Sequence, residues 1–420
     1  MNEKKKLQPK VRFREFTGEN APDWEQRKLG KVANMHARIG WQNLRTSEFL
    51  DSGEYMLITG TDFRDGKIDY SRVHYVEKER YEQDKKIQLS NGSILITKDG
   101  TIGKVAYIEN LPMKSTLNAG VFNLTVVDDI NTSSLYLYHY LKGPFLLRFV
   151  NEESTGGTIK HLNQNVLVKF PIPLPSYREQ LKISSFLTNI DNLITLHQRK
   201  LEQLEQLKNT LLSKMFPKSG TNIPEIRFSG FTDAWKQRKL GEVSEIVRGA
   251  SPRPIQDPKW FDINSEIGWL RISDVTNQNG KIYYLEQKIS KLGQEKTRVL
   301  QYPHLLLSIA ASVGKPVINY IKTGVHDGFL IFMNPKFDRE FMFQYLDLYK
   351  PLWQTYGQPG SQVNLNSDIV KNHKMSLPSI EEQQSIGLFF EKIDNLITIH
   401  QRNLDNLKNM KQTLLNKMFV

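Results

Sequence analysis

Side chains able to read nucleic-acid bases gather in a few loops of this 420-residue chain. Arginine, asparagine and glutamine can make paired hydrogen bonds to base edges, whereas lysine and backbone amides suit phosphates. The candidates in the first half are Arg38, Trp41, Gln42, Asn43, Arg45, Lys98, Thr158 and Lys160. The candidates in the second half are Arg248, Arg253, Gln256, Lys259, Trp260, Gln354, Tyr356, Gln358, Ser361 and Gln362. Each loop alone is weak evidence because such residues also cover ordinary solvated surfaces, but together they predict DNA contact.

The charge balance of the chain supports a polyanionic partner. It carries 57 Lys and Arg against 45 Asp and Glu, a formal net charge of +12. Nucleic acid is the usual partner of such a chain, and an acidic membrane is the lesser alternative. Mild basicity without a function is the third interpretation. The chain has no cysteine and no apolar run of about 18 residues, which favours a cytoplasmic protein that does not enter a membrane.

Motifs for catalysis or for a bound cofactor are missing from the sequence. Gly103-Lys104 and Gly314-Lys315 are followed by valine and proline, so neither forms a Walker loop. The chain has no Pro-Pro pair, which excludes the Asn/Asp-Pro-Pro-aromatic tetrad of amino-methyltransferases. The segment from Asp65 to Lys67 is similar to a nuclease Asp-x-Lys element but lacks an acidic partner upstream. We therefore expect no catalytic residue, no metal and no cofactor on this chain.

The elements that must position these loops occur twice. Residues 174–216 return as residues 377–419 at a constant offset of 394 − 191 = 203, with 25 of 43 positions identical. Trp24 to Gly30 returns as Trp235 to Gly241. The stretches between these copies scarcely resemble each other. Two matching frames with two different fillings indicate one task performed on two different targets.

Each repeated 43-residue segment has the pattern of a long helix. Apolar positions step by fours and threes, a period of 3.5 residues that predicts a coiled-coil seam. In the first copy these positions are Ile183, Leu187, Ile190, Ile194, His197, Leu201, Leu204, Lys208, Leu211 and Met215, and the second copy keeps the register from Ile386 to Met418. Because the copies occupy equivalent places, we expect the two helices to pair antiparallel with pseudo-twofold symmetry.

Some identical positions of the two helices are not needed for that seam. They are Asp191, Asn192, Thr195, Gln198 and Arg199, with their copies Asp394, Asn395, Thr398, Gln401 and Arg402. Outer positions kept alike in two copies suggest that both helices face the same partner. A duplication too recent to have diverged is the alternative, and the divergence of the intervening stretches argues against it.

The divergent stretches have short apolar runs and many turns, which predicts two mixed α/β domains and an α+β fold class for the whole chain. The expected order is an N-terminal arm (1–23), a first variable domain (24–173), a central helix (174–216), a linker (217–234), a second variable domain (235–376) and a C-terminal helix (377–420).

These motifs resemble a known family. Each long helix begins with Leu-Pro-x-x-x-Glu-Gln and contains Ile-Asp-Asn-Leu-Ile, and each variable domain opens with Trp-x-x-x-x-Leu-Gly-x-Val. The motif residues are Leu174, Pro175, Glu179, Gln180, Trp24, Leu29, Gly30 and Val32, with Leu377, Pro378, Glu382, Gln383, Trp235, Leu240, Gly241 and Val243. The chain resembles the specificity subunit of type I restriction–modification systems. It departs locally, with Ala310-Ala311 in one turn where the first half has Asp99-Gly100.

The resemblance implies a DNA reader that is not catalytic by itself. Each variable domain would be a target-recognition domain for one half of a bipartite site in double-stranded DNA, and the helices would set the spacing. Two adenine-methylating subunits that use S-adenosylmethionine would dock on the helices, and motor-nuclease subunits that use ATP and magnesium would complete the complex. Two alternatives remain at this point: a stand-alone DNA-binding regulator, and a fused nuclease or methyltransferase.

Overall fold

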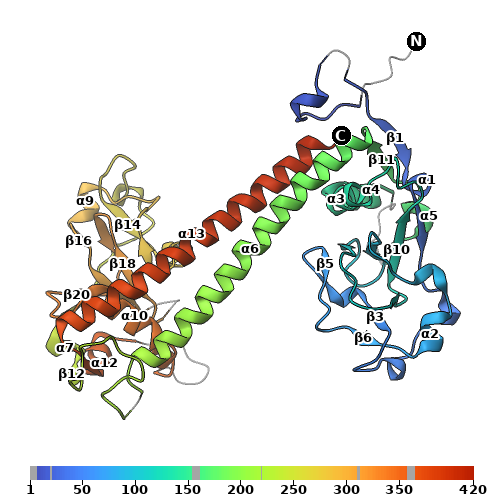
Figure 1. Ribbon diagram of the computed structural model, residues 1–420. Coiled ribbons are helices and arrows are strands. Elements are labelled where there is room, and N and C mark those ends of the chain that lie inside the picture. The colour runs from blue at the N-terminus through green and yellow to red at the C-terminus, as the bar shows by residue number, and fades with distance from the viewer. Residues whose placement is uncertain (1–6, 19–20, 154–160, 219, 310–312, 357–364) are drawn as a thin grey trace. The chain divides into compact units, whose positions relative to one another are not determined.

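The computed structural model describes residues 7–18, 21–153, 161–218, 220–309, 313–356 and 365–420 (Figure 1). The chain forms two compact units. The first comprises Met1–His197 and Asn403–Val420, and the second comprises Gln198–Arg402. Each unit thus contains one mixed α/β domain together with segments of both long helices. The expectation of mixed α/β domains followed by long helices is confirmed.

The first unit is built from eleven described strands and the helices that cover them. The strands are β1 (Glu25–Lys28), β2 (Ala33–His36), β3 (Met56–Ile58), β4 (Phe63–Arg64), β5 (Lys67–Ile68), β6 (His74–Tyr75), β7 (Ile94–Thr97), β8 (Val105–Tyr107), β9 (Ser115–Leu117), β10 (Val121–Val126) and β11 (Pro171–Leu174). The helices are α1 (Leu29–Val32), α2 (Lys78–Glu82), α3 (Ser134–Lys142), α4 (Pro144–Glu153), α5 (Gln164–Leu167) and the start of α6 (Tyr177–Met215). Short 3-10 turns include η2 (Gly40–Gln42) and η3 (Thr46–Glu48).

The main sheet of the first unit separates two hydrophobic cores. Its order is β2-β10-β7-β8, all antiparallel. Because successive side chains of a strand point to opposite faces, Ile94 and Ile96 enter the core beneath α3 and α4, whereas Leu95 enters a second core beside β3 and β9. This burial on both faces explains why the Ser93–Thr97 run is apolar without polar alternation.

The second unit repeats this plan with a larger sheet. Its strands are β12 (Lys236–Lys239), β13 (Glu245–Arg248), β14 (Gly268–Leu270), β15 (Lys281–Ile282), β16 (Arg298–Leu300), β17 (Leu305–Ser308), β18 (Pro316–Asn319), β19 (Thr323–Val325), β20 (Phe329–Met333) and β21 (Lys374–Leu377). Its helices are α7 (Leu240–Val243), α8 (Ile272–Asn277), α9 (Lys291–Gln294), α10 (Arg339–Leu348), α11 (Lys350–Gln354), α12 (Ser367–Asn372) and α13 (Ile380–Met418). The sheet order β13-β20-β17-β18-β15 again separates two cores, with Leu305 and Leu307 on one face and Leu306 on the other.

A two-stranded pairing closes each domain just before its long helix. In the first unit β1 pairs antiparallel with β11, from Glu25↔Leu174 to Lys28↔Pro171. In the second, β12 pairs antiparallel with β21, from Lys236↔Leu377 to Lys239↔Lys374. The repeated tryptophan before each first strand is buried in the domain core. The repeated sequence segments therefore form the two-stranded pairing that links each variable domain to its long helix.

The Glu-Gln pair at the start of each long helix connects the helix to other segments of its unit. Glu179 forms a bidentate ion pair with Arg12 of the N-terminal arm, with N–O distances of 2.7 and 2.8 Å. The Gln180 amide accepts a hydrogen bond from the backbone N–H of Ser133, the residue that caps α3, at 2.9 Å. In the second unit, Glu382 binds Arg227 of the linker in the same bidentate way, at 2.6 and 2.7 Å. This motif therefore has a structural role in both units.

Candidate nucleic-acid interface

The loop after β2 carries the predicted residues of the first unit, and two of them face inward. Arg38 is only 2% exposed. Its Nε donates to the Leu117 carbonyl at 2.8 Å and its Nη1 to the Gln83 Oε1 atom at 3.2 Å. Burial lowers the pKa of the Arg38 guanidinium. Gln42 is also buried, at 4% exposed. Both side chains are therefore buried beneath the loop, and their predicted contact with DNA stays a prediction.

Other residues of this loop do reach the surface. Asn43 and Arg45 are exposed, and the backbone N–H of Arg45 donates to the Glu48 carboxylate at 2.8 Å. Glu48 is also bound by Arg80 at 2.6 Å, so the loop is held on α2. The Trp41 side chain lies outside the described residues. Asn43 and Arg45 thus remain the candidates of this loop with accessible side chains.

A second candidate loop of the first unit begins at Lys98. This half-buried lysine places its Nζ 5.6 Å from the centre of the Phe122 ring. Its backbone carbonyl accepts a hydrogen bond from the Leu162 N–H at 2.9 Å, which places Leu162 beside the end of β7. Thr158 and Lys160 lie outside the described residues, so their predicted contacts stay predictions.

In the second unit, the loop that follows β13 forms a basic edge around Asp327. The Arg248 Nε atom donates to the Asp327 carbonyl at 2.6 Å, and Arg253 forms an ion pair with the Asp327 carboxylate at 2.7 Å. Arg298 donates to the Arg248 carbonyl at 2.8 Å, which adds a third guanidinium to the edge. Arg248 and Arg253 are exposed. The structure thus brings these two predicted residues together.

The neighbouring residues of the same loop have unequal roles. Trp260 is buried and its Nε1 donates to the Pro254 carbonyl at 2.8 Å. Lys259 lies over the Trp260 ring at 4.5 Å from its centre. Trp260 therefore holds the loop from inside, and its predicted contact with DNA stays a prediction. Gln256 and Lys259 are exposed, as is Tyr356. The Gln354 side chain and the residues Gln358, Ser361 and Gln362 lie outside the described residues.

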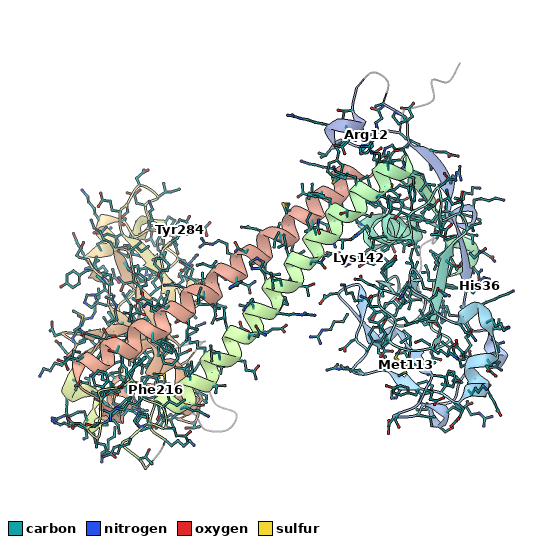
Figure 2. The ribbon with its side chains drawn as sticks, viewed as in Figure 1. Arg12, His36, Met113, Lys142, Phe216 and Tyr284 are labelled. Carbon is teal, nitrogen blue, oxygen red and sulfur yellow. The ribbon has the colours of Figure 1, made fainter. Side chains whose placement is uncertain are left out.

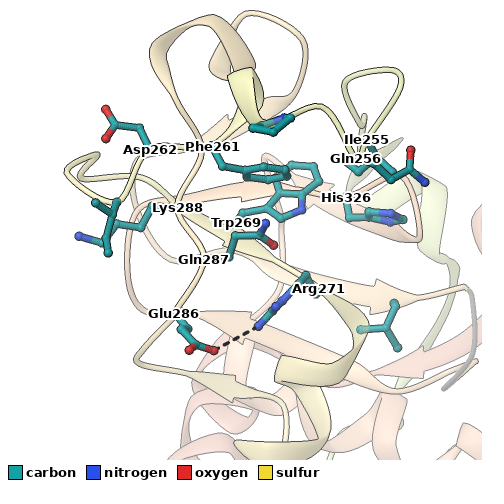
Figure 3. A pocket seen from close by; sticks show the side chains of 13 residues that line it. Ile255, Gln256, Phe261, Asp262, Trp269, Arg271, Glu286, Gln287, Lys288 and His326 are labelled. Atoms are coloured by element: carbon teal, nitrogen blue, oxygen red, sulfur yellow. Dashed lines mark ion pairs between the residues drawn. The ribbon is translucent and has the colours of Figure 1, made fainter.

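An open cleft of about 740 Å³ lies beside this basic edge (Figure 3). Phe261, Trp269 and Ile255 give it apolar walls, and the polar side chains around them include Gln256, Gln287 and His326. Ten of its residues are labelled in the close view. The sequence prediction included Gln256 alone among them. Trp269, Arg271, Gln287 and His326 were missed because they come from segments that are far apart in the chain and carry no motif.

The residues predicted to dock a partner divide into internal and external ones. Asp191 forms an ion pair with Lys411 of α13 and lies 3.5 Å from the Nζ of Lys142, which reaches from α3 and is labelled in Figure 2. Asp394 repeats this role: Lys208 of α6 pairs with it at 2.7 Å and Gln344 of α10 donates to it at 2.7 Å. Both carboxylates therefore have partners within the chain, and their predicted contact with a partner subunit stays a prediction.

The remaining docking candidates lie on or near the outer faces of the helices. The hydroxyls of Thr195 and Thr398 donate to the carbonyls four residues earlier, and the Gln198 amide donates to Glu202. Asn192, Arg199, Asn395, Gln401 and Arg402 are exposed. Exposed apolar residues that the sequence prediction missed stand beside them. These are Leu193, Leu196 and Leu207 on α6, with the equivalent Leu396, Ile399 and Met410 on α13.

The residues that the structure describes contain no group of three or more histidine, aspartate or glutamate side chains placed to hold a metal ion. None of their helices combines the length and the apolar character needed to cross a membrane.

Comparison with known proteins assigns the family. The model of the type I restriction modification DNA specificity domain matches residues 22–206 and again residues 232–409. The chain therefore belongs to this family, with one copy of the domain in each half. It is accordingly a DNA specificity subunit of a type I restriction–modification system, with two DNA-recognition domains.

Relatives and solved structures agree with this assignment. The type I restriction enzyme MjaVIII specificity subunit of Methanocaldococcus jannaschii is 25% identical over 97% of this chain and 95% of its own length. The EcoBI specificity subunit of Escherichia coli is 22% identical over 72% of this chain and 68% of its own length. The crystal structure of the type I S subunit from M. genitalium has a TM-score of 0.67 at 15% identity and covers 99% of both chains. The structural likeness extends to the whole fold.

Proposed function

We propose that each recognition domain binds one half of a bipartite DNA site. The observation that carries this proposal is the pairing of like sheets with unlike surfaces. The loop after β2 in the first unit exposes Asn43 and Arg45, whereas the loop after β13 in the second unit exposes Arg253, Gln256 and Lys259. Two readers with the same frame and different edges suit two different half-sites.

We further propose that α6 and α13 pair as an antiparallel coiled coil with pseudo-twofold symmetry. Two ion pairs support this arrangement, one inside each unit: Asp191 with Lys411, and Lys208 with Asp394. From the first pair to the second, the position on α6 advances by seventeen residues, from 191 to 208. The position on α13 moves back by the same number, from 411 to 394, as it must for antiparallel helices. Both pairs are related by the repeat offset of 203 residues. These are the polar interruptions of the apolar seam, and such interruptions fix register in coiled coils.

The helix length limits the distance between the half-sites. Each of α6 and α13 has 39 residues, or about 60 Å at 1.5 Å per residue. Such a spacer cannot exceed about 18 base pairs of DNA, and reading two major grooves from one face favours roughly 10 base pairs between centres. Deleting one heptad from both helices should therefore shorten the gap that the protein accepts.

The partners follow from the exposed face of the helices. We propose that two adenine-methylating subunits dock there, each against one copy of the apolar residues Leu193 and Leu196 or Leu396 and Ile399, flanked by Arg199 and Arg402. Duplicated exposed apolar residues are the feature expected of a surface that receives two copies of one subunit. S-adenosylmethionine would be bound by those subunits, and ATP with magnesium by motor-nuclease subunits, in the cytoplasm. We also propose domain boundaries at residues 23, 173, 216, 234 and 376. They divide the chain into the arm, the two recognition domains, the two helices and the linker.

A domain exchange tests the half-site proposal. Residues 24–173 are replaced by the equivalent reader of a relative, and the methylated motif of the reconstituted complex is determined. We expect one half of the motif to change while the other half and the gap stay the same. A change in both halves, or in neither, would contradict the proposal.

A further inference from the structure

We propose that the cleft beside the basic edge of the second unit reads one A·T base pair, with the Gln287 amide on the adenine edge. This inference rests on the proposed function of that domain as a DNA reader, and it adds a base and a residue to it. The cleft lies among the 255–263 loop, the strand β14 and the 286–288 segment (Figure 3).

Gln287 is held in place by the backbone around it. The Trp269 N–H donates to the Gln287 carbonyl at 2.7 Å, and the next residue, Lys288, forms a β-bridge with Gly268. The side chain is half-buried in the cleft. A fixed backbone beside a partly buried amide gives the preorganised geometry that paired hydrogen bonds to a base require.

The amides in the cleft are available for a ligand. Within the described part of the chain, neither Gln287 nor Gln256 has a side-chain hydrogen bond. His326 also lines the cleft: the Gly328 N–H donates to its Nδ1 at 2.9 Å, and the same atom lies 3.1 Å from a carboxylate oxygen of Asp327. Burial lowers the pKa of His326, which favours the neutral ring. A glutamine amide matches the N6 donor and N7 acceptor of adenine.

The walls of the cleft suit the other base of the pair. Phe261, Ile255 and the edge of Trp269 are apolar, and thymine is the base that carries a methyl group in the major groove. The carboxylates of Asp262 and Glu286 line the cleft together with Arg271 and Lys288, and Glu286 lies 3.9 Å from Arg271, so the cleft has no excess positive charge to attract a phosphate. Phosphates are instead expected at the adjoining basic edge of Arg248 and Arg253. This charge pattern favours a base edge inside the cleft and the phosphate backbone of the DNA outside it.

The first unit has a different side chain at the equivalent place. Trp269 pairs with Gly324 in the parallel β14–β19 ladder, and the same position of the β3–β9 ladder is Leu57, paired with Thr116. Both side chains are buried, but Trp269 lines the cleft. The aromatic wall of the cleft is therefore a feature by which the second reader differs from the first.

The test uses the full chain reconstituted with its methylating subunits on double-stranded oligonucleotides with randomised half-sites. The variants are Gln287→Ala and, as a matched control, Gln301→Ala, whose exposed glutamine lies outside the cleft. A paired contact contributes about 1–3 kcal/mol of base discrimination, so we expect Gln287→Ala to lose roughly tenfold preference for A·T at one position of one half-site. Gln301→Ala should keep the parent motif, and thermal melting checks that both variants fold.

The outcomes separate this inference from the function on which it rests. A parent chain without a bipartite motif would overturn the proposed function itself. A bipartite parent motif that Gln287→Ala leaves unchanged would overturn the cleft assignment alone. Relaxation at a G·C position would also overturn it, as would weakened association with the methylating subunits without any change in sequence preference, which would make the cleft a protein-docking surface.

Discussion

The ion pair between Asp191 and Lys411 gives the most demanding test of the packing. Their side chains are 19% and 11% exposed, and Lys142 is the second cation near the carboxylate. Burial alone would raise the pKa of Asp191. The two lysines nevertheless hold this pKa below its ordinary value. Replacing Asp191 by asparagine leaves both ammonium groups partly buried without their counter-ion.

The expected cost follows from this geometry. Removing one partner of a buried ion pair typically costs about 3–5 kcal/mol, and the remaining exposure here favours the lower end, about 3 kcal/mol. For a unit of this size that is roughly 6–12 °C in the melting temperature. The double variant Asp191→Leu with Lys411→Leu removes this ion pair, and Lys142 keeps its hydrogen bonds to the Asp65 carbonyl and the Tyr138 hydroxyl, so the variant should lie within about 1 kcal/mol of the parent.

The assay is urea unfolding of the full chain followed by circular dichroism, in a double-mutant cycle. Asp394→Asn is the matched variant in the second unit, and Glu205→Gln, at an exposed site on α6, is the control. If Asp191→Asn is no more destabilising than Glu205→Gln, or if the double variant is the least stable of the set, the ion pair does not have the role assigned to it.

Three further predictions rest on single side chains. Arg38→Met should destabilise the first unit by about 2–3 kcal/mol, because it leaves the Leu117 carbonyl without its donor; stability within 0.5 kcal/mol of the parent, together with a changed base preference in the half-site of the first domain, would contradict the supporting role. Burial lowers the pKa of Lys411 to about 8, against 10.5 for an unfolded lysine. The unfolded state then holds more protons between pH 8 and 10.5, so the unfolding free energy should rise across that window in the parent relative to Lys411→Met; equal slopes would refute the shift. Leu196→Asp with Ile399→Asp should abolish co-purification of the methylating subunits while leaving the melting temperature unchanged, and retained binding would exclude this face.

The sequence predicted the long helices better than the contacts of their polar side chains. The heptad spacing from Ile183 and Ile386 identified the long helices because a seam of that length has few alternative structures. The roles of Lys208 and Lys411 as seam interruptions were visible, but their aspartate partners were not, since Lys411 and Asp191 are 220 residues apart. Identity between the copies of Asp191 therefore indicated an external partner although the structure gives an internal one.

The candidate site was predicted only in part, for a related reason. Arg38 and Trp260 have the residue types of a DNA contact, and only the strands and loops packed over them decide that they are buried. The cleft could not be predicted because its walls come from β14, the 255–263 loop and the 286–288 segment. Nothing local distinguishes Gln287 from a solvated glutamine.

Mapping of adenine methylation in the source cell with and without this gene tests the central claim most directly. If the two domains read two half-sites for methylating partners, one bipartite motif with a fixed gap should lose its methylation when the gene is removed, and return with the intact gene. A methylation pattern that stays the same without the gene, or the loss of a continuous motif without a gap, would contradict the account.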